Sequence, residues 1–435
     1  MKKTVTAVFD IGKTNKKFFL FDDEFQEVYR EYVQFDEITD EDGHPTEDLS
    51  ALRDWLKTVF DRMLKTEKYE IKAINFSSYG ASLVHLDENR DVIFPLYNYT
   101  KSIPQNIIDS FYEKYGPEAD FHQKTGSSSS GMLNAGMQLY WLKNTKPEVF
   151  KKIRYSLHLP QYLSFVFTGI PLSEYTSIGC HTSLWDFEKR DYHDWVYAEN
   201  LDQILPPIVS TETSINMNYN GKRIKIGVGI HDSSAALLPY VRSLKNQFIL
   251  ISTGTWSIAL NPFVERTLSK KDVADDCINY MRINGKPVKS ARLFLGNEYS
   301  IQVKKLTEYY QVDKDYHKTV KFDPEIHYEI VKEFEKIFKW ESIEDPEMPE
   351  ETHLRYTSFD HAYHHLMMEL VLLQVESIKS AKGNMTIEKL FVDGGFSDND
   401  IYIHLLSHHF RTMELRTTDS SLGSALGAAI CISDT

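Results

Sequence analysis

The stretch Val5-Thr-Ala-Val-Phe-Asp-Ile-Gly-Lys-Thr-Asn-Lys-Lys-Phe-Phe-Leu-Phe21 decides the fold. Its two ends, Val5–Phe9 and Lys17–Phe21, are short runs rich in Val, Phe and Leu, which is the pattern of buried β-strands. Between them, Asp10–Thr14 is polar and contains a glycine, a combination typical of a tight turn. The sequence therefore predicts a strand, a polar glycine turn and a returning strand.

The same design recurs in the second half of the chain. Phe248–Ser252 and Trp256–Leu260 read as strands, and Gly254 stands in the turn between them, where Gly12 stood in the first hairpin. A repeat at so long a period indicates two duplicated lobes and excludes a solenoid. A polar stretch at Val241–Asn246 follows an apolar helix, so we place the domains at residues 1–241 and 242–435.

The rest of the chain alternates strands with helices. Ala73–Ser77 and Leu83–Leu86 have the composition of strands, whereas Met137–Lys146 and His361–Ala381 have the apolar spacing of helices. This alternation predicts an α/β fold. The acidic, proline-containing stretch Trp340–Glu351 is predicted to be a solvated loop.

Composition limits the classes of partner. The 435 residues suffice for two or three domains, and 42% hydrophobic and 26% charged residues are typical of a globular protein. A net charge of −14 argues against nucleic acid or an anionic membrane as partner, because both require a basic face. Three cysteines exclude a disulfide framework or a zinc ribbon, and the apolar run at residues 4–9 is too short for a signal peptide. We expect a cytoplasmic protein without a membrane span.

The first hairpin turn is a candidate phosphate site. Gly12 allows the backbone to approach a phosphate closely, Thr14 and Asn15 offer polar contacts, and Lys13 or Lys17 supplies positive charge. Ala7 stands where a P-loop requires its first glycine, and the turn leads into a strand, so the P-loop is excluded. An ordinary hairpin turn is the alternative.

Asp10 lies at the carboxyl end of the buried strand that leads into this turn, where a carboxylate can hold a hydrated Mg²⁺. In the second hairpin, Thr253, Gly254 and Thr255 repeat the combination of glycine and hydroxyl groups, so the two turns together can hold a phosphate chain from both sides. A third turn, at Gly394 and Gly395, joins a strand to a helix. Ligands of open α/β sheets bind at such strand ends, although a tight connection also favours glycine.

Asp232 is the candidate catalytic base. It follows the predicted strand Ile224–Ile230 and precedes a helix that begins near Ser233. A carboxylate at a helix N-terminus is expected to be ionised, because the helix dipole favours negative charge there, and it can then accept a proton from a bound hydroxyl. The alternative is that Asp232 only caps its helix. Asp232 also occupies the place of the third glycine after Gly227 and Gly229, which disfavours a dinucleotide-binding turn.

Taken in order, four motifs resemble the FGGY family of carbohydrate kinases: Phe9–Thr14, Gly229–Asp232, Ser252–Trp256 and Asp393–Ser397. Residues 421–429 are similar to the small-residue helix that closes the family's sequences. The resemblance implies two actin-like, ribonuclease H-like lobes with ATP and a sugar in the cleft between them. It also implies that Asp232 is the general base, that Asp10 organises Mg²⁺, that both hairpins hold the phosphates, and that Gly394 and Gly395 border the adenosine.

The sugar-facing region departs from the family pattern. Many relatives have Trp-Asn-Asp-x-Arg where this chain has Tyr97–Lys101, and methyl-sugar kinases often have Asp at the position of Ser82. On the family mapping, the substrate contacts are Tyr79, Gly80 and Ser82. Relatives often have Thr for Lys13 and Arg near Lys17.

The resemblance therefore implies ATP-dependent phosphorylation of a primary hydroxyl of a ketose or polyol, with a 6-deoxyketohexose or a pentulose as substrate. An actin- or chaperone-like ATPase and a catalytically silent sugar-binding protein are the alternatives. The expected partners are a small sugar and, at most, a second copy of the chain in a homodimer. The sequence alone does not decide between the sugars.

Overall fold

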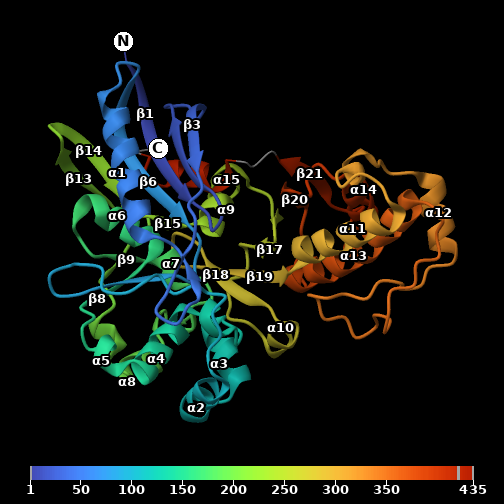
Figure 1. The fold of residues 1–435 in the computed structure, drawn as a ribbon, viewed down its shortest axis with the longest axis horizontal. Helices are drawn as coiled ribbons and strands as arrows, with labels where there is room; N and C mark the ends of the chain where they lie inside the picture. The colour runs from blue at the N-terminus through green and yellow to red at the C-terminus, as the bar shows by residue number, and fades with distance from the viewer. Residues whose placement is uncertain (1, 419–421, 434–435) are drawn as a thin grey trace.

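A computed structural model describes residues 2–418 and 422–433. Ser421, the first residue of the small-residue segment, lies outside them. Two mixed β-sheets lie in separate halves of the molecule, with the first half of the chain in one and most of the second half in the other (Figure 1).

The first sheet contains the N-terminal hairpin at its centre. β1 (Lys3–Ile11) pairs antiparallel with β2 (Lys16–Phe21), which pairs antiparallel with β3 (Glu27–Val33). On its other side β1 pairs in parallel with β6 (Tyr69–Ser78), followed by β14 (Lys222–Gly227), parallel to β6, and the antiparallel edge strand β13 (Ser214–Tyr219). The short β15 (Ile230–His231) continues beside the end of β6. This end of the sheet carries Asp10.

The second sheet repeats this plan. β16 (Phe248–Thr253) pairs antiparallel with β17 (Ser257–Asn261), β17 with β19 (Pro287–Leu293), and β19 with β18 (Ile278–Met281). β20 (Lys389–Gly394) and then β21 (Glu414–Thr418) run parallel to β16. In both sheets a central hairpin is extended on one side by at least one more antiparallel strand and on the other side by two parallel strands. The duplication predicted from the two hairpins is thereby confirmed.

Helices cover both sheets and contribute side chains to three large hydrophobic cores. In the first lobe, α1 (Leu49–Lys65) and α6 (Leu159–Thr168) pack on the sheet, where Phe76 stacks on Phe167 with ring centroids 5.4 Å apart. In the second lobe, α11 (Leu295–Tyr310), α12 (Pro324–Lys332), α13 (Phe359–Lys382) and α14 (Asp400–His409) share one core. A third core around Trp195 joins α2 (Gln105–Tyr115), α3 (Glu118–Thr125), α4 (Ala135–Thr145) and α8 (Asp194–Ala198).

The first and last parts of the chain meet through a helix pair. α9 (Asp232–Ser243) packs against α15 (Gly423–Cys431), and both contact β1 or β6 of the first sheet. Gly427 makes this possible, because a Cβ at that position would lie 1.8 Å from the carbonyl oxygen of Ala235. The boundary between residues 241 and 242 stays a prediction, and α15 packs with the first lobe although it lies beyond that boundary in the chain.

The predicted loop at Trp340–Glu351 and the predicted strand at Leu83–Leu86 are both present, and the structure adds their contacts. Residues 340–351 form an irregular loop, but Trp340 and Ile343 are buried in the core of the second lobe, so this loop is anchored by apolar contacts and is not simply solvated. β7 (Leu83–Leu86) leaves the main sheet and pairs with β8 (Tyr155–His158). The shorter elements are β4 (Ile38–Thr39), β5 (Pro45–Thr46), α5 (Pro147–Phe150), β9 (Ser173–Glu174), α7 (Tyr175–Ile178), β10 (Trp185–Asp186), β11 (Asp191–Tyr192), β12 (Ile208–Val209) and α10 (Lys270–Ala274).

Within the described residues, every helix is too short or too polar to span a lipid bilayer.

Candidate active site

Asp10 is buried at the end of β1 and is held from the far end of the chain. Its Oδ1 accepts a hydrogen bond of 2.9 Å from the hydroxyl of Ser424 on α15, and its Oδ2 lies 3.9 Å from Nζ of Lys17. Burial raises the pKa of the Asp10 carboxyl, and Lys17 and Ser424 partly oppose that rise. Ser424 was missed in the sequence, where nothing distinguishes it from the other small residues of its helix.

A single carboxylate of this kind suits Mg²⁺, which keeps several waters and takes only one or two protein carboxylates beside the phosphates it binds. Among the described residues no cluster of three His, Cys, Asp or Glu side chains is arranged to hold a metal ion. The site therefore fits a hydrated ion held jointly with a ligand and does not fit a closed structural metal centre.

Asp232 is the first residue of α9, and His231 occupies the N-cap position without a capping bond from its side chain. The Asp232 Oδ1 accepts hydrogen bonds from the backbone N–H of Ser233 at 2.5 Å and from its hydroxyl at 3.2 Å. The side chain is 34% exposed. Capping of α9 therefore does not occupy this carboxylate fully, and one face of it is open to a ligand.

Burial raises the pKa of Asp232 to about 6, and the hydrogen bonds from Ser233 only partly oppose the rise. The stabilisation expected from the helix N-terminus is thus outweighed by the loss of hydration. A carboxyl with this pKa is ionised at neutral pH yet can take up a proton, which is the property required of a general base. The negative charge of Asp232 also raises the pKa of Asp10, so the two carboxylates belong to one site.

His231 connects Asp232 to Gly80. Its Nε2 lies 3.3 Å from Oδ1 of Asp232 and 3.1 Å from Sγ of Cys180. A Cβ at Gly80 would lie 2.9 Å from the same Nε2, so only glycine lets this loop approach the ring so closely. Burial lowers the pKa of His231 to about 3, and the imidazole is therefore neutral. Of the three predicted substrate contacts, Gly80 is the one that the structure places against His231, which in turn contacts Asp232.

The other two predicted substrate contacts, Tyr79 and Ser82, lie in different surroundings from Gly80. The Tyr79 hydroxyl donates a hydrogen bond of 2.6 Å to Oε1 of Glu47, which forms an ion pair of 2.8 Å with the buried Lys16. Ser82 is only 2% exposed. The ring of Tyr99 lies 6.2 Å from that of Tyr79.

In the segment Tyr97–Lys101, two side chains serve the scaffold. Lys101 pairs with Asp40 at 2.5 Å and Asp42 at 2.6 Å, which ties the loop between β4 and β5 to this segment. Tyr97 is buried against Trp141. Burial and the negative charge of Asp232 raise the pKa of Tyr99. Tyr99 is therefore the member of this segment near Asp232. The sequence analysis did not single out this residue.

The first hairpin forms a closed turn, in which the Gly12 N–H donates to the carbonyl of Asn15 at 3.0 Å. Lys13 forms an ion pair of 3.0 Å with Glu37, and the Asn15 side chain accepts a bond from Gln34, whereas Thr14 is exposed. Lys17 is therefore the hairpin lysine that stands next to Asp10.

The second hairpin borders a cavity of about 340 Å³ in the second lobe. Three predicted residues line it, Gly254, Thr255 and Gly395. Six further residues from two segments complete the lining, and the sequence analysis did not select them as contacts: Gly296, Asn297, Tyr299, Ser300, Phe396 and Asn399. The volume falls within the roughly 300–1,000 Å³ range of pockets that hold small molecules.

Thr253 and Gly394 build this cavity without lining it. The buried Thr253 hydroxyl donates to the carbonyl of Asp393 at 2.5 Å and accepts from the N–H of Phe396 at 3.0 Å, so it fastens the third turn to the hairpin. Gly394 has a φ of +88°, and a Cβ there would lie 1.8 Å from the Thr253 carbonyl oxygen. Thr253 and Gly394, which were predicted to contact the cofactor, therefore pack against other parts of the protein.

The other wall of the cavity is the start of α11. The Asn297 N–H donates to the Thr255 carbonyl at 3.1 Å, and a Cβ at Gly296 would lie 1.8 Å from the Gly254 carbonyl oxygen. The hairpin thus rests directly on the helix backbone. The only signal of this contact in the sequence is a glycine at the second residue of a helix.

Comparison with known proteins agrees with this arrangement of two lobes. Residues 5–237 match the model of the N-terminal domain of the FGGY family of carbohydrate kinases, and residues 245–330 match a model of the FGGY carbohydrate kinase C-terminal domain. The chain belongs to the FGGY family of carbohydrate kinases.

Curated relatives are similar over part of their length. A rhamnulokinase of Oceanobacillus iheyensis is 25% identical over 204 residues, covering 44% of this chain and 41% of the relative. A xylulose kinase of Lactococcus lactis is 26% identical over 201 residues, covering 43% and 38%. The chain thus spans about two-fifths of the length of these two relatives.

Solved structures match nearly the whole chain. A carbohydrate kinase from Novosphingobium aromaticivorans superposes with a TM-score of 0.81 at 23% identity, covering 99% of this chain and 92% of that one. Plasmodium falciparum glycerol kinase with ADP gives a TM-score of 0.75 at 17% identity, covering 99% and 89%. The predicted α/β fold of two actin-like lobes is confirmed.

Proposed function

We propose that this protein transfers a phosphoryl group from Mg²⁺·ATP to a hydroxyl group of a sugar. The observation that carries the proposal is the Asp232 carboxyl, whose pKa of about 6 and partial exposure suit a general base, at the same end of the sheet as Asp10, with the end of β6 between them. Family membership supports the same reaction class.

The residues of the chain divide the work. Asp232 accepts the proton of the sugar hydroxyl as the oxygen attacks, and neutral His231 contacts Oδ1, the same carboxylate oxygen that Ser233 contacts. Asp10, kept in place by Ser424, would hold Mg²⁺ through water. The cavity lined by Thr255, Gly395 and Asn399 would hold the adenosine, with the Gly254 turn at its edge. When bound, Mg²⁺ neutralises charge on the phosphate oxygens during transfer.

For the substrate, we propose a ketose or polyol phosphorylated at a primary hydroxyl, with a 6-deoxyketohexose or a pentulose as the first candidates. Similarity to rhamnulokinases and to a xylulose kinase supports these two groups. Tyr99 and His231 are the side chains near Asp232. Tyr99 belongs to the segment Tyr97–Lys101, where many relatives have Trp-Asn-Asp-x-Arg. Since this segment departs from that pattern, the sugar must be recognised by other contacts.

The experiment is a coupled ADP-release assay over ketoses and polyols, with Asp232→Asn as a matched variant that keeps the side-chain shape. We expect one sugar to stimulate ADP release in the wild type and the variant to lose about 10²-fold or more in kcat while still binding that sugar. ADP release that no sugar stimulates would instead indicate an actin- or chaperone-like ATPase. Sugar binding without ADP release would indicate a silent sugar-binding protein.

A further inference from the structure

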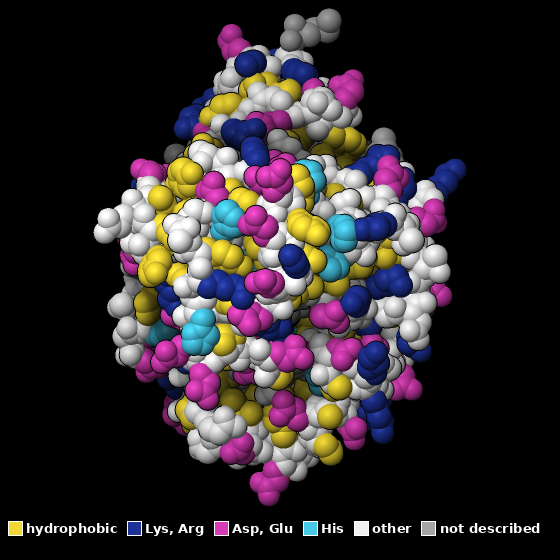
Figure 2. Space-filling model, turned by 90° about the vertical axis from the view of Figure 1, so that its right-hand side faces the viewer, with side chains coloured by type: hydrophobic (Ala, Val, Ile, Leu, Met, Phe, Trp, Pro, Cys, Tyr) yellow, Lys and Arg dark blue, Asp and Glu magenta, His cyan; other side chains and the backbone are white. Residues whose placement is uncertain are grey.

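A second cavity, of about 550 Å³, lies in the second lobe between α12, α13 and α14. None of the residues that line it lines the nucleotide cavity. Its volume is in the range of pockets that hold small organic molecules. Figure 2 shows the face of the molecule at the end of this lobe, where histidines lie beside hydrophobic side chains and charges of both signs are interspersed.

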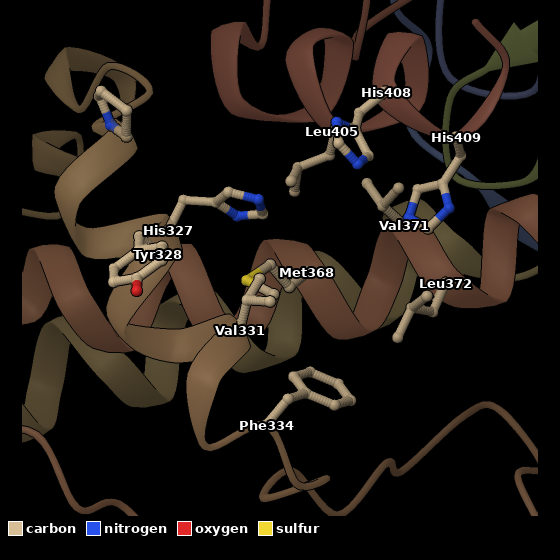
Figure 3. A pocket seen from close by; sticks show the side chains of 11 residues that line it. His327, Tyr328, Val331, Phe334, Met368, Val371, Leu372, Leu405, His408 and His409 are labelled. Atoms are coloured by element: carbon tan, nitrogen blue, oxygen red, sulfur yellow. The ribbon is translucent and has the colours of Figure 1, made fainter.

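One side of this cavity is apolar, and the other carries imidazole rings beside apolar side chains. Figure 3 shows Val331, Phe334 and Met368 on the first side, whereas His408 and His409 of α14 lie on the second side with Leu405 and Val371 beside them. The ring of His327 reaches in from α12. Val331 is 51% exposed and Phe334 37% exposed, although both are large and apolar. A cavity divided in this way suits a ligand with an apolar body and one polar head.

The polar groups of the cavity can donate hydrogen bonds, since each neutral imidazole carries one N–H and Tyr328 carries a hydroxyl. The Nδ1 of His327 is a buried atom without a hydrogen-bond partner, and leaving such a group unpaired is costly. Arg411 donates to the His408 ring at 2.9 Å, which brings a guanidinium to the same end. Tyr328 also lines the cavity and adds a hydroxyl group. None of the described residues that line the cavity is acidic. An acceptor-only, negatively charged head fits this end best.

Burial and the neighbouring histidines lower the pKa of His327, and burial lowers that of His409. Both rings are therefore neutral at pH 7 and can each donate one N–H to a ligand. This favours a singly charged head over a phosphate ester, which would bring two negative charges to a site with one nearby guanidinium.

We propose that the cavity between α12, α13 and α14 binds an organic carboxylate with an aliphatic or aryl-alkyl body, whose carboxylate meets His327, His409 and Arg411. The site is independent of the proposed kinase reaction, since it shares no lining residue with the nucleotide cavity.

Octanoate, below its micellar concentration, is the probe, and isothermal titration and thermal shift of the whole chain are the measurements. Octanol carries the same tail without the charge and serves as the ligand control. We expect saturable binding of one octanoate per chain and at least about tenfold weaker binding of octanol, because a neutral hydroxyl accepts weaker hydrogen bonds than a carboxylate does.

Two variants test the position of the ligand. Leu372→Trp adds bulk to the apolar lining and is expected to abolish binding, while the double variant His327→Ala with His409→Ala removes donors without adding bulk and is expected to weaken octanoate at least about tenfold. His404→Ala is the matched control, because His404 is exposed on the same helix but does not line the cavity, and it should bind as the wild type does.

Three results would overturn the proposal. The first is no saturable binding of octanoate, and the second is octanol binding as tightly as octanoate. The third is light scattering that shows self-association abolished by Leu372→Trp, which would assign the cavity to a contact between two copies of the chain. If Leu372→Trp does not fold, the histidine double variant decides between binding at this cavity and binding elsewhere.

Discussion

The hydroxyl of Ser424 donates a 2.9 Å hydrogen bond to Oδ1 of Asp10, which joins residues 414 positions apart in the sequence. Asp10 is the second-last residue of the first strand and Ser424 the second residue of the last helix, so the magnesium-binding carboxylate that we propose is completed only when the chain returns to its starting lobe. α15 contacts both α9, which begins with Asp232, and β1. One helix pair thus positions both carboxylates.

We expect Ser424→Ala to weaken Mg²⁺·ATP binding by roughly tenfold, because the charged form of Asp10 loses a hydrogen bond in a buried position. Titration of the nucleotide at several Mg²⁺ concentrations measures this effect. Ser243→Ala, at the exposed end of α9, is the control and should leave the affinity unchanged. Equal affinities for both variants and the wild type would remove the Ser424 contact from the site.

The rate should depend on the ionisation of Asp232. Since a base must be deprotonated to accept a proton and burial raises its pKa to about 6, kcat/KM is expected to fall about tenfold for each pH unit below about pH 6 and to level off above about pH 7. A profile from pH 5 to 9 with the sugar found in the screen measures this dependence. A pH-independent rate between pH 5 and 7 would contradict the assignment of the base.

The same carboxyl should cost stability at neutral pH. Its folded-state pKa is raised above the unfolded value, so between about pH 4 and 6 the folded state binds more protons than the unfolded state, and the free energy of unfolding falls as the pH rises. Asp232→Asn stays neutral and avoids that loss. We expect the variant to have a higher Tm than the wild type at pH 7 and the same Tm below about pH 4. A lower Tm at pH 7 would show that the ionised form is stabilised by contacts that outweigh its burial.

The two hairpins and the two-lobe fold could be predicted from the sequence, because the signals for strands and turns are local. Val5–Phe9 and Phe248–Ser252 are apolar enough to read as buried strands, and Gly12 and Gly254 mark their turns without reference to the rest of the chain. Asp10 and Asp232 could be singled out because a polar residue directly after a buried strand is conspicuous. The role of each remains a proposal.

The missed residues depend on contacts between distant segments. The roles of Ser424, Gly296 and Tyr99 depend on the residues that pack against them, and these residues are distant in the sequence. The raised pKa of Asp232 is likewise a property of its surroundings, because the helix N-terminus visible in the sequence acts in the opposite direction to burial.

The contact of the second hairpin with α11 provides the last prediction. A Cβ at Gly296 would lie 1.8 Å from the Gly254 carbonyl oxygen, and because the Cβ is bonded directly to the helix backbone and the oxygen is itself backbone, neither can move alone. Gly296→Ala should therefore push the turn away from the helix, lower the Tm and weaken ADP binding by at least about tenfold, since the cavity wall and the turn separate together. Lys304→Ala is the control, because Lys304 is exposed on the same helix and does not line the cavity, so it should bind ADP as the wild type does. Calorimetric titration with ADP and thermal unfolding of both variants measure the difference. If Gly296→Ala bound ADP as the wild type does while its Tm fell, the hairpin would not be part of the nucleotide site, and the assignment of the 340 Å³ cavity to adenosine would fail.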